Sequence, residues 1–287
     1  MIWFVFAFVG ALMQALYYFF SKRFLLKIDS EVLAAGAFLI AGICFGLIAF
    51  FAGIPNINAD LFLFSGGSAV IGIIGTILTY KALKITDLSL TMPMLAFTPI
   101  FTILISSIML GEFPSIIGLI GIFLGVIGAY VINLSDKNSG FFGPIKSVFQ
   151  NKGVFLMLIV SFLYAFIPNF DKIVIQNYNV FIGAAFTHFF MGFFFLISSF
   201  RKQKSPMKVI FSDFPKILLL GLIAFFSIIT INIALTMQIV PYVMSMKRLS
   251  ILFGVFIGTI FLKEPNKRNR IIGAVIMLIG VILLVFS

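Results

Sequence analysis

The chain is a succession of apolar runs, each about 20 residues long, separated by short polar gaps. A helix of about 20 residues rises about 30 Å, which matches the hydrocarbon core of a bilayer. Strands of a membrane barrel would be about half as long and would alternate in hydrophobicity. The sequence therefore predicts an all-α integral membrane protein with ten transmembrane helices. Their expected ranges are residues 2–20, 31–51, 61–80, 88–110, 115–134, 153–170, 180–200, 215–237, 240–262 and 270–286.

The composition excludes a soluble fold. Of the 287 residues, 62% are hydrophobic and 10% are charged, whereas soluble domains carry about 25% charged residues. A single cysteine, Cys44, excludes a disulfide framework and a cysteine-based metal site. The net charge of +11 does not indicate nucleic-acid binding, because the basic residues are largely confined to short gaps between apolar runs, where a membrane surface accounts for them.

The two halves of the chain resemble each other when one is shifted by 152 residues. The longest polar gap, residues 136–152, divides the chain into an N-terminal repeat (1–135), a cytoplasmic linker and a C-terminal repeat (153–287). Five helices in each repeat mean that equivalent helices run in opposite directions. Such inverted repeats suit alternating access to a site near the membrane midplane. The most informative matches are Glu112 with Glu264, Gly121 with Gly273, and Gly128 with Gly280.

The basic residues predict the orientation in a cell membrane. All but three of the 20 lie in the odd-numbered connections, and Lys172 alone lies in an even-numbered one. Since cytoplasmic loops carry the excess of Lys and Arg, both termini are expected outside. The first apolar run lacks a basic leader and is expected to be a retained helix. The residues assigned to the cytoplasm are Lys22, Arg23, Lys27, Lys81, Lys84, Lys137, Lys146, Lys152, Arg201, Lys202, Lys204, Lys208, Lys216, Lys263, Lys267, Arg268 and Arg270.

Glycine and glutamate motifs recur in both repeats. Gly111-Glu112 precedes a series of spaced glycines, and Leu262-Lys263-Glu264 precedes a second series. With ten helices and a five-plus-five duplication, this pattern resembles the EamA branch of the drug/metabolite transporter superfamily. The resemblance implies transport or export of small metabolites and does not fix the substrate. The glycines of the two series are Gly118, Gly121, Gly125 and Gly128, then Gly273 and Gly280.

Lys247 and Arg248 lie inside the expected helix 240–262. A basic residue at the centre of a spanning helix costs about 2.5–3.5 kcal/mol. Their counterparts under the shift are Leu95 and Ala96, so the scaffold itself does not require charge there. We expect the pair to bind an anionic group, although both side chains could instead snorkel to the outer interface. The dipeptide also resembles the plastid sugar-phosphate translocators, in which such a pair helps to bind phosphate.

Other polar side chains point to a central cavity or to helix packing. Tyrosine and amide side chains at helical spacing are candidate substrate contacts, although serine and threonine hydroxyls can bond to their own helix carbonyls. The glutamates at equivalent helix ends and the glycines are expected to be structural, since small residues allow close helix packing. The substrate candidates beside the basic pair are Gln14, Tyr18, Tyr80, Tyr164, Asn232 and Ser245; the structural candidates are Glu112, Glu264, Gly121, Gly125, Gly273 and Gly280.

Four further residues have alternative interpretations. Asp171 and Lys172, at the end of the expected sixth helix, form either a gate or a local ion pair. His188 could relay protons or satisfy a neighbour, and Tyr242 could be an interfacial anchor. Small cation-drug antiporters of the superfamily have a glutamate in helix one, and this chain has no acidic residue there. That difference argues against proton-coupled export of cationic drugs.

Together these features predict a secondary transporter or exporter of a small anionic or zwitterionic metabolite, working by alternating access. Its partners would be the solute and membrane lipid, without nucleic acid, and it would function as a monomer. A flippase for a phosphate-containing lipid or lipid-linked headgroup is the alternative, and a non-transporting scaffold is the third. No nucleophile–base pair, phosphate-binding loop or metal-ligand cluster is present in the sequence. We therefore expect no enzymatic activity, cofactor or metal.

Overall fold

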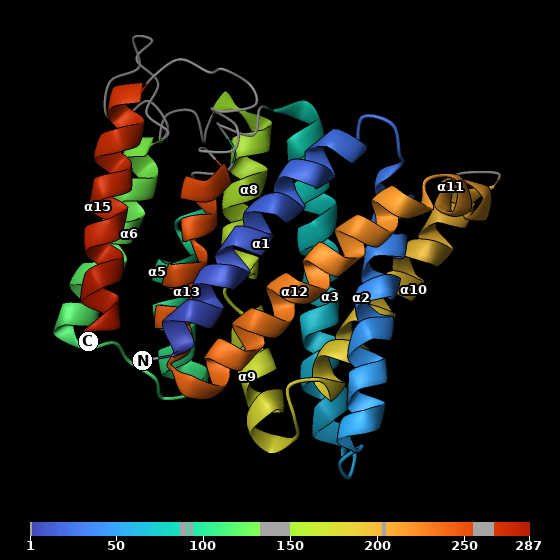
Figure 1. Cartoon of the computed structure of the whole chain (residues 1–287), viewed down its shortest axis with the longest axis horizontal. Helices are drawn as coiled ribbons and strands as arrows, with labels where there is room; N and C mark the ends of the chain where they lie inside the picture. Colours follow the sequence, from blue (N-terminus) through green and yellow to red (C-terminus); the bar gives the residue numbers. More distant parts are fainter. Residues whose placement is uncertain (1, 87–90, 92–93, 133–149, 203–204, 255–266) are drawn as a thin grey trace.

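A computed structural model describes residues 2–86, 91, 94–132, 150–202, 205–254 and 267–287. These residues form helices and connections, without a strand among them. Figure 1 shows the helices side by side, with both chain ends on one face. The helices are α1 (Trp3–Phe24), α2 (Ser30–Ala52), α3 (Ala59–Ile85), α5 (Thr98–Met109), α6 (Ile116–Ile132), α8 (Lys152–Leu163), α9 (Ile167–Asn177), α10 (Ile182–Lys202), α11 (Pro206–Ser212), α12 (Phe214–Met237), α13 (Val240–Lys247) and α15 (Lys267–Val285).

Each of the ten expected ranges contains a described helix, and the prediction of an all-α membrane fold is confirmed. In the described part, six helical segments are long and apolar enough to cross a membrane, and shorter apolar helices accompany them. The expected sixth helix is too short: α8 and α9 together continue to Asn177, past Asp171 and Lys172. Most of the expected linker 136–152, and Glu264, lie outside the described residues.

Equivalent helices pack against one another across the two repeats. The pair α2 and α10 and the pair α6 and α15 each join a helix to its own counterpart. The contact of α1 with α12 is matched by the contact of α3 with α8 and α9. Figure 1 shows α6 leaving the face of the chain ends, whereas α15 returns to it, and α2 and α10 also run in opposite directions. This pattern is that of two repeats of inverted topology.

Two spanning segments are interrupted at equivalent places. The backbone leaves the helix at Ala96 and Phe97 just before α5, and again at Arg248 just after α13. The shift of 152 residues superimposes Ala96 on Arg248. A third interruption, Tyr164–Phe166, separates α8 from α9, which begins with Pro168 in its first turn. Such interruptions free backbone polar groups, which are tolerated at membrane depth only inside protein or beside a cavity.

Helices α6 and α15 approach each other through glycines. A Cβ atom at Gly280 would lie 2.7 Å from Gly121 O and 2.9 Å from Gly125 N. At Gly128, a Cβ atom would lie 2.6 Å from Gly273 O. A side chain at Gly280 or Gly128 would collide with backbone, so glycine is required at these two positions for this close approach. The structure thus places these five glycines in the contact between the last helices of the two repeats.

Candidate functional site

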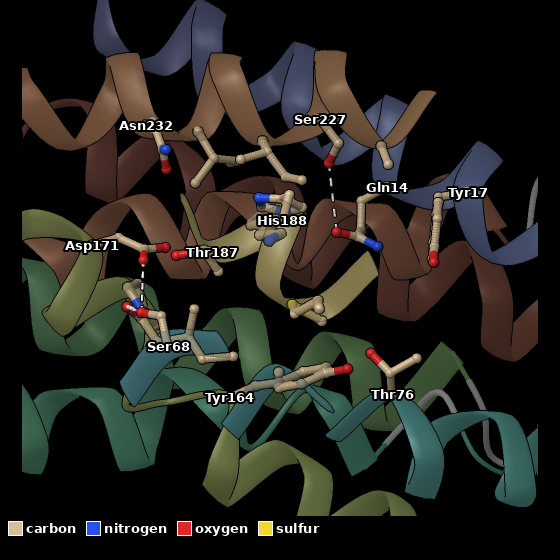
Figure 2. A pocket seen from close by; sticks show the side chains of 18 of the residues that line it. Gln14, Tyr17, Ser68, Thr76, Tyr164, Asp171, Thr187, His188, Ser227 and Asn232 are labelled. Atoms are coloured by element: carbon tan, nitrogen blue, oxygen red, sulfur yellow. Dashed lines mark hydrogen bonds between the residues drawn. The ribbon is translucent and has the colours of Figure 1, made fainter. Parts of the chain in front are cut away.

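A cavity of about 180 Å³ lies between the two repeats. Its wall comes from α1, α2, α3, α9, α10, α12 and α13, together with Tyr164 at the end of α8. Figure 2 shows Asp171, Ser68, Thr187 and Asn232 at one end and Gln14, Tyr17 and Thr76 at the other. The cavity also reaches the two cations. Its apolar wall includes Phe38, Ile167, Met191, Ala224, Ile228, Ile231, Leu235 and Met244.

Lys247 and Arg248 both line this cavity. Lys247 is the last residue of α13, and Arg248 caps the helix through its backbone N–H. Arg248 is only 6% exposed, and its Nε finds no hydrogen-bond partner among the described residues. Lys247 lies within the electrostatic range of Asp171, and Arg248 within that of the hydroxyls of Tyr18 and Tyr164, without an ion pair or hydrogen bond between them among the described residues. The interruption of the ninth span therefore brings two cations to the cavity wall.

Of the neutral side chains predicted to contact substrate, all but one line the cavity. Ser245 is the exception, because its Oγ donates a hydrogen bond to Pro241 O at 2.7 Å. Residues two positions apart in a helix point about 200° away from each other around its axis, so Ser245 and Lys247 face opposite ways. Its hydroxyl satisfies the preceding turn, as serine often does in a helix. The five that line the cavity are Gln14, Tyr18, Tyr80, Tyr164 and Asn232.

Hydroxyl groups form a polar belt on the wall formed by α1, α3 and the end of α8. Tyr17 Oη lies 3.0 Å from Tyr80 Oη, and Tyr164 Oη lies 3.5 Å from Thr79 Oγ1. The Tyr164 ring packs on Gly75, where a Cβ atom would lie 2.2 Å from the ring. These neutral donors and acceptors can bind a polar ligand without adding charge to the cavity.

Asp171 is the cavity residue that the sequence did not place correctly. It lies within the sixth span, half-buried, and its Oδ1 accepts a hydrogen bond from Ser68 Oγ at 2.8 Å. Thr187 and Asn232 line the same end of the cavity (Figure 2). Had the expected helix been extended, Tyr164, Pro168 and Asp171 would have appeared at spacings of +4 and +7, on one face.

Lys172 pairs with Glu112 and not with Asp171, so the prediction of a local ion pair between Asp171 and Lys172 is wrong. Its Nζ lies 2.5 Å from Glu112 Oε1 and donates to Gln238 O at 2.7 Å. The other oxygen of Glu112 accepts a hydrogen bond from Val240 N, the first residue of α13, at 2.7 Å. Glu112 thus satisfies one of the unpaired N–H groups at a helix start.

Two other side chains with alternative interpretations are buried. His188 lies between Phe38 and Phe45, and its Nδ1 donates to Ala184 O at 2.7 Å. Tyr242 is 3% exposed and accepts a hydrogen bond from Ser115 N at 3.0 Å. An anchor at the membrane interface would expose its hydroxyl to water, so that interpretation of Tyr242 is wrong.

The sequence pattern of the EamA-like transporter family matches residues 1–134 and 151–286. The chain belongs to the EamA-like transporter family. Its two matched segments correspond to the two repeats, and the resemblance drawn from the glutamate and glycine motifs is confirmed. This EamA-like protein is therefore a multi-pass membrane transporter of the drug/metabolite type.

A crystal structure titled only "Crystal structure of protein" has a TM-score of 0.73 and 12% sequence identity, covering 98% of this chain and 96% of that one. At that identity the likeness concerns the fold alone. A search of the curated proteins gave no match.

Proposed function

We propose that this protein transports a small zwitterionic solute, with its anionic group on Lys247 and Arg248 and its cationic group on Asp171. The observation that carries this proposal is that these three charged side chains line one cavity between the inverted repeats. Transport would proceed by alternating access in the cell membrane. We propose a single chain as the functional unit, since the described cavity wall already draws on both repeats of one chain.

The anionic end of the solute is inferred from the unsatisfied cations. Arg248 is almost completely buried, and its Nε lacks a hydrogen-bond partner among the described residues. A buried cation without a partner is costly, so water or a ligand anion must accompany it. A carboxylate or phosphate would accept the planar fork of Arg248 and the point charge of Lys247.

The cationic end is inferred from Asp171. Among the described residues, the carboxylate accepts a hydrogen bond from the neutral Ser68 hydroxyl and forms no ion pair within 4 Å. An ammonium group would supply a charged donor and could also bond to the amide oxygen of Asn232. The same cavity wall includes Met191, Ile231 and Leu235, which offer an apolar surface for a carbon skeleton.

Matched probes test the need for both charges. Leucine, 4-methylpentanoate and 3-methylbutylamine share the same branched side chain. Leucine carries both an ammonium and a carboxylate group, 4-methylpentanoate only the carboxylate, and 3-methylbutylamine only the ammonium group. Phenylalanine, 3-phenylpropanoate and 2-phenylethylamine form a second series. We expect the amino acids to raise the melting temperature of the purified protein more than either single-charge analogue. Equal stabilisation by an acid and its amino acid would contradict a cationic subsite.

The same screen addresses the flippase alternative. Phosphoethanolamine also carries both charges, but on a phosphate headgroup. Stabilisation by phosphoethanolamine without stabilisation by any amino acid would favour a lipid headgroup as the cargo. The opposite result would favour an aqueous solute. Failure of all the zwitterions, amino acids and phosphoethanolamine alike, would overturn the zwitterion proposal.

A further inference from the structure

A second, smaller cavity adjoins the first. Its volume of about 10 Å³ is comparable to the space that one water needs. It extends from Asp171 along Ser65 and Gly183 to Asn179, in the connection between α9 and α10. Figure 1 shows that connection on the same face as the two chain ends. The residues common to both cavities are Asp171, Thr187, His188, Ile228 and Asn232.

Asp171 is the acidic residue at this boundary. From it, the larger cavity extends to Tyr17 and Tyr80, in the later parts of α1 and α3. The smaller cavity extends the opposite way, toward the face of the chain ends. The carboxylate of Asp171 thus lies between the larger cavity on one side and a space for one water on the other.

Few of the helices packed around Asp171 bring a charged or titratable side chain near its carboxylate. The helices packed against α9 include α3, α5, α10, α12 and α13. Near Asp171, α3 presents the hydroxyl of Ser68 and α12 the amide of Asn232, neither of which titrates. On α5, Ser106 instead bonds to Asn169. The titratable and charged groups lining the larger cavity with Asp171 are His188, Lys247, Arg248, Tyr17, Tyr18, Tyr80 and Tyr164.

Neither His188 nor the two cations form an ion pair with the Asp171 carboxylate among the described residues. The Nδ1–H of His188 is already donated to Ala184 O. Lys247 attracts the carboxylate but lies beyond ion-pair distance. An ionised carboxylate at membrane depth that lacks a close cation is costly, and either a proton or a ligand cation removes that cost. The two cannot serve together, because a protonated carboxyl group has no charge to offer an ammonium group.

We propose that Asp171 is a proton-binding site whose proton exchanges with the cationic group of the substrate. The inference rests on the proposed zwitterionic substrate. When the substrate enters, the carboxyl O–H bond breaks and the proton passes to water on the face to which the cavity is then open. The carboxylate pairs with the ammonium group. When the substrate leaves on the other face, water returns a proton to Asp171, so one proton crosses against each solute.

Proton release measures this exchange directly. A leucine–phenylalanine mixture is added to the purified full-length protein in weakly buffered detergent solution containing a pH-indicator dye. We expect release of up to about one proton per bound probe, and binding that tightens up to about tenfold per pH unit while Asp171 is largely protonated. Asp171→Asn should release none and bind independently of pH. Asp60→Asn makes the same change at an exposed position in the first turn of α3 and should behave as the parent protein.

Several results would overturn the proposal. These are equal proton release from Asp171→Asn and the parent, probe binding without release in the parent, or loss of release in His188→Gln but not in Asp171→Asn. An infrared acid titration without probe separates this inference from the proposed function. It should show the carbonyl band of a protonated carboxyl group that disappears in Asp171→Asn and persists in Asp60→Asn. Absence of that difference would exclude the proton site, whereas failure of every probe to bind would reject the zwitterionic substrate.

Discussion

Lys172 Nζ lies 2.5 Å from Glu112 Oε1, so an ion pair joins the C-terminal repeat to the N-terminal one. The two side chains are only 8% and 14% exposed. Removing one member of a buried pair leaves the other charge uncompensated and costs about 3–5 kcal/mol. We therefore predict that Lys172→Met lowers the melting temperature of the purified protein by several degrees.

Adding Glu112→Gln to Lys172→Met should restore part of that loss, because it removes the stranded carboxylate. The matched control is the pair of Asp213 with Lys216, whose side chains are 24% and 42% exposed. Lys216→Met should change the stability by less than about 1 kcal/mol. Equal effects of the two lysine changes would show that burial does not distinguish the pairs.

The basic pair provides a test of ligand binding. We predict that Arg248→Gln weakens binding of a stabilising amino acid by about 10- to 100-fold, since a charged hydrogen bond contributes about 1.5–3 kcal/mol. Ser245→Ala, three residues earlier and outside the cavity wall, should leave the affinity unchanged. The affinities come from titration of the melting temperature. Normal binding by the Lys247→Gln, Arg248→Gln double variant would restore the snorkelling interpretation.

The glycines of α6 and α15 allow a matched comparison. Gly280→Ala would place a Cβ atom 2.7 Å from Gly121 O, so the two helices must separate. We predict a loss of about 1–3 kcal/mol, typical of overpacking. Gly125→Ala should have little effect, because its Cβ atom would have no neighbour within 4 Å. Thermal unfolding in detergent measures both, and a greater loss for Gly125→Ala would contradict the described helix contact.

The basic residues also predict the orientation. We propose that both termini lie outside, because nearly all lysines and arginines fall in the odd-numbered connections. An alkaline phosphatase fusion at the C-terminus, whose enzyme folds only outside the cytoplasm, should then be active. A fluorescent fusion that matures only in the cytoplasm should be dark. The reverse result would place the excess of positive charge outside.

The helix ranges and the duplication were predictable. Bilayer thickness requires each span to be a long apolar run, and the basic residues mark the connections between the spans. The course of the sixth span was not. Asp171 and Lys172 have the hydropathy of a membrane boundary, yet each is accommodated by residues distant in sequence, Ser68 for the aspartate and Glu112 with Gln238 O for the lysine. The position of Ser245 outside the cavity wall was also not predictable, since composition does not show which face of a short helix meets a cavity.

The start of α13 is held by Glu112, and its end carries Lys247 and Arg248. Eight residues at 1.5 Å per residue make this helix about 12 Å long. A rigid rod that short transmits displacement almost undiminished from one end to the other. Any shift of Glu112 against Lys172 would thus move the cationic wall of the cavity. Mutations far from the ligand, at this contact, would be expected to alter substrate affinity.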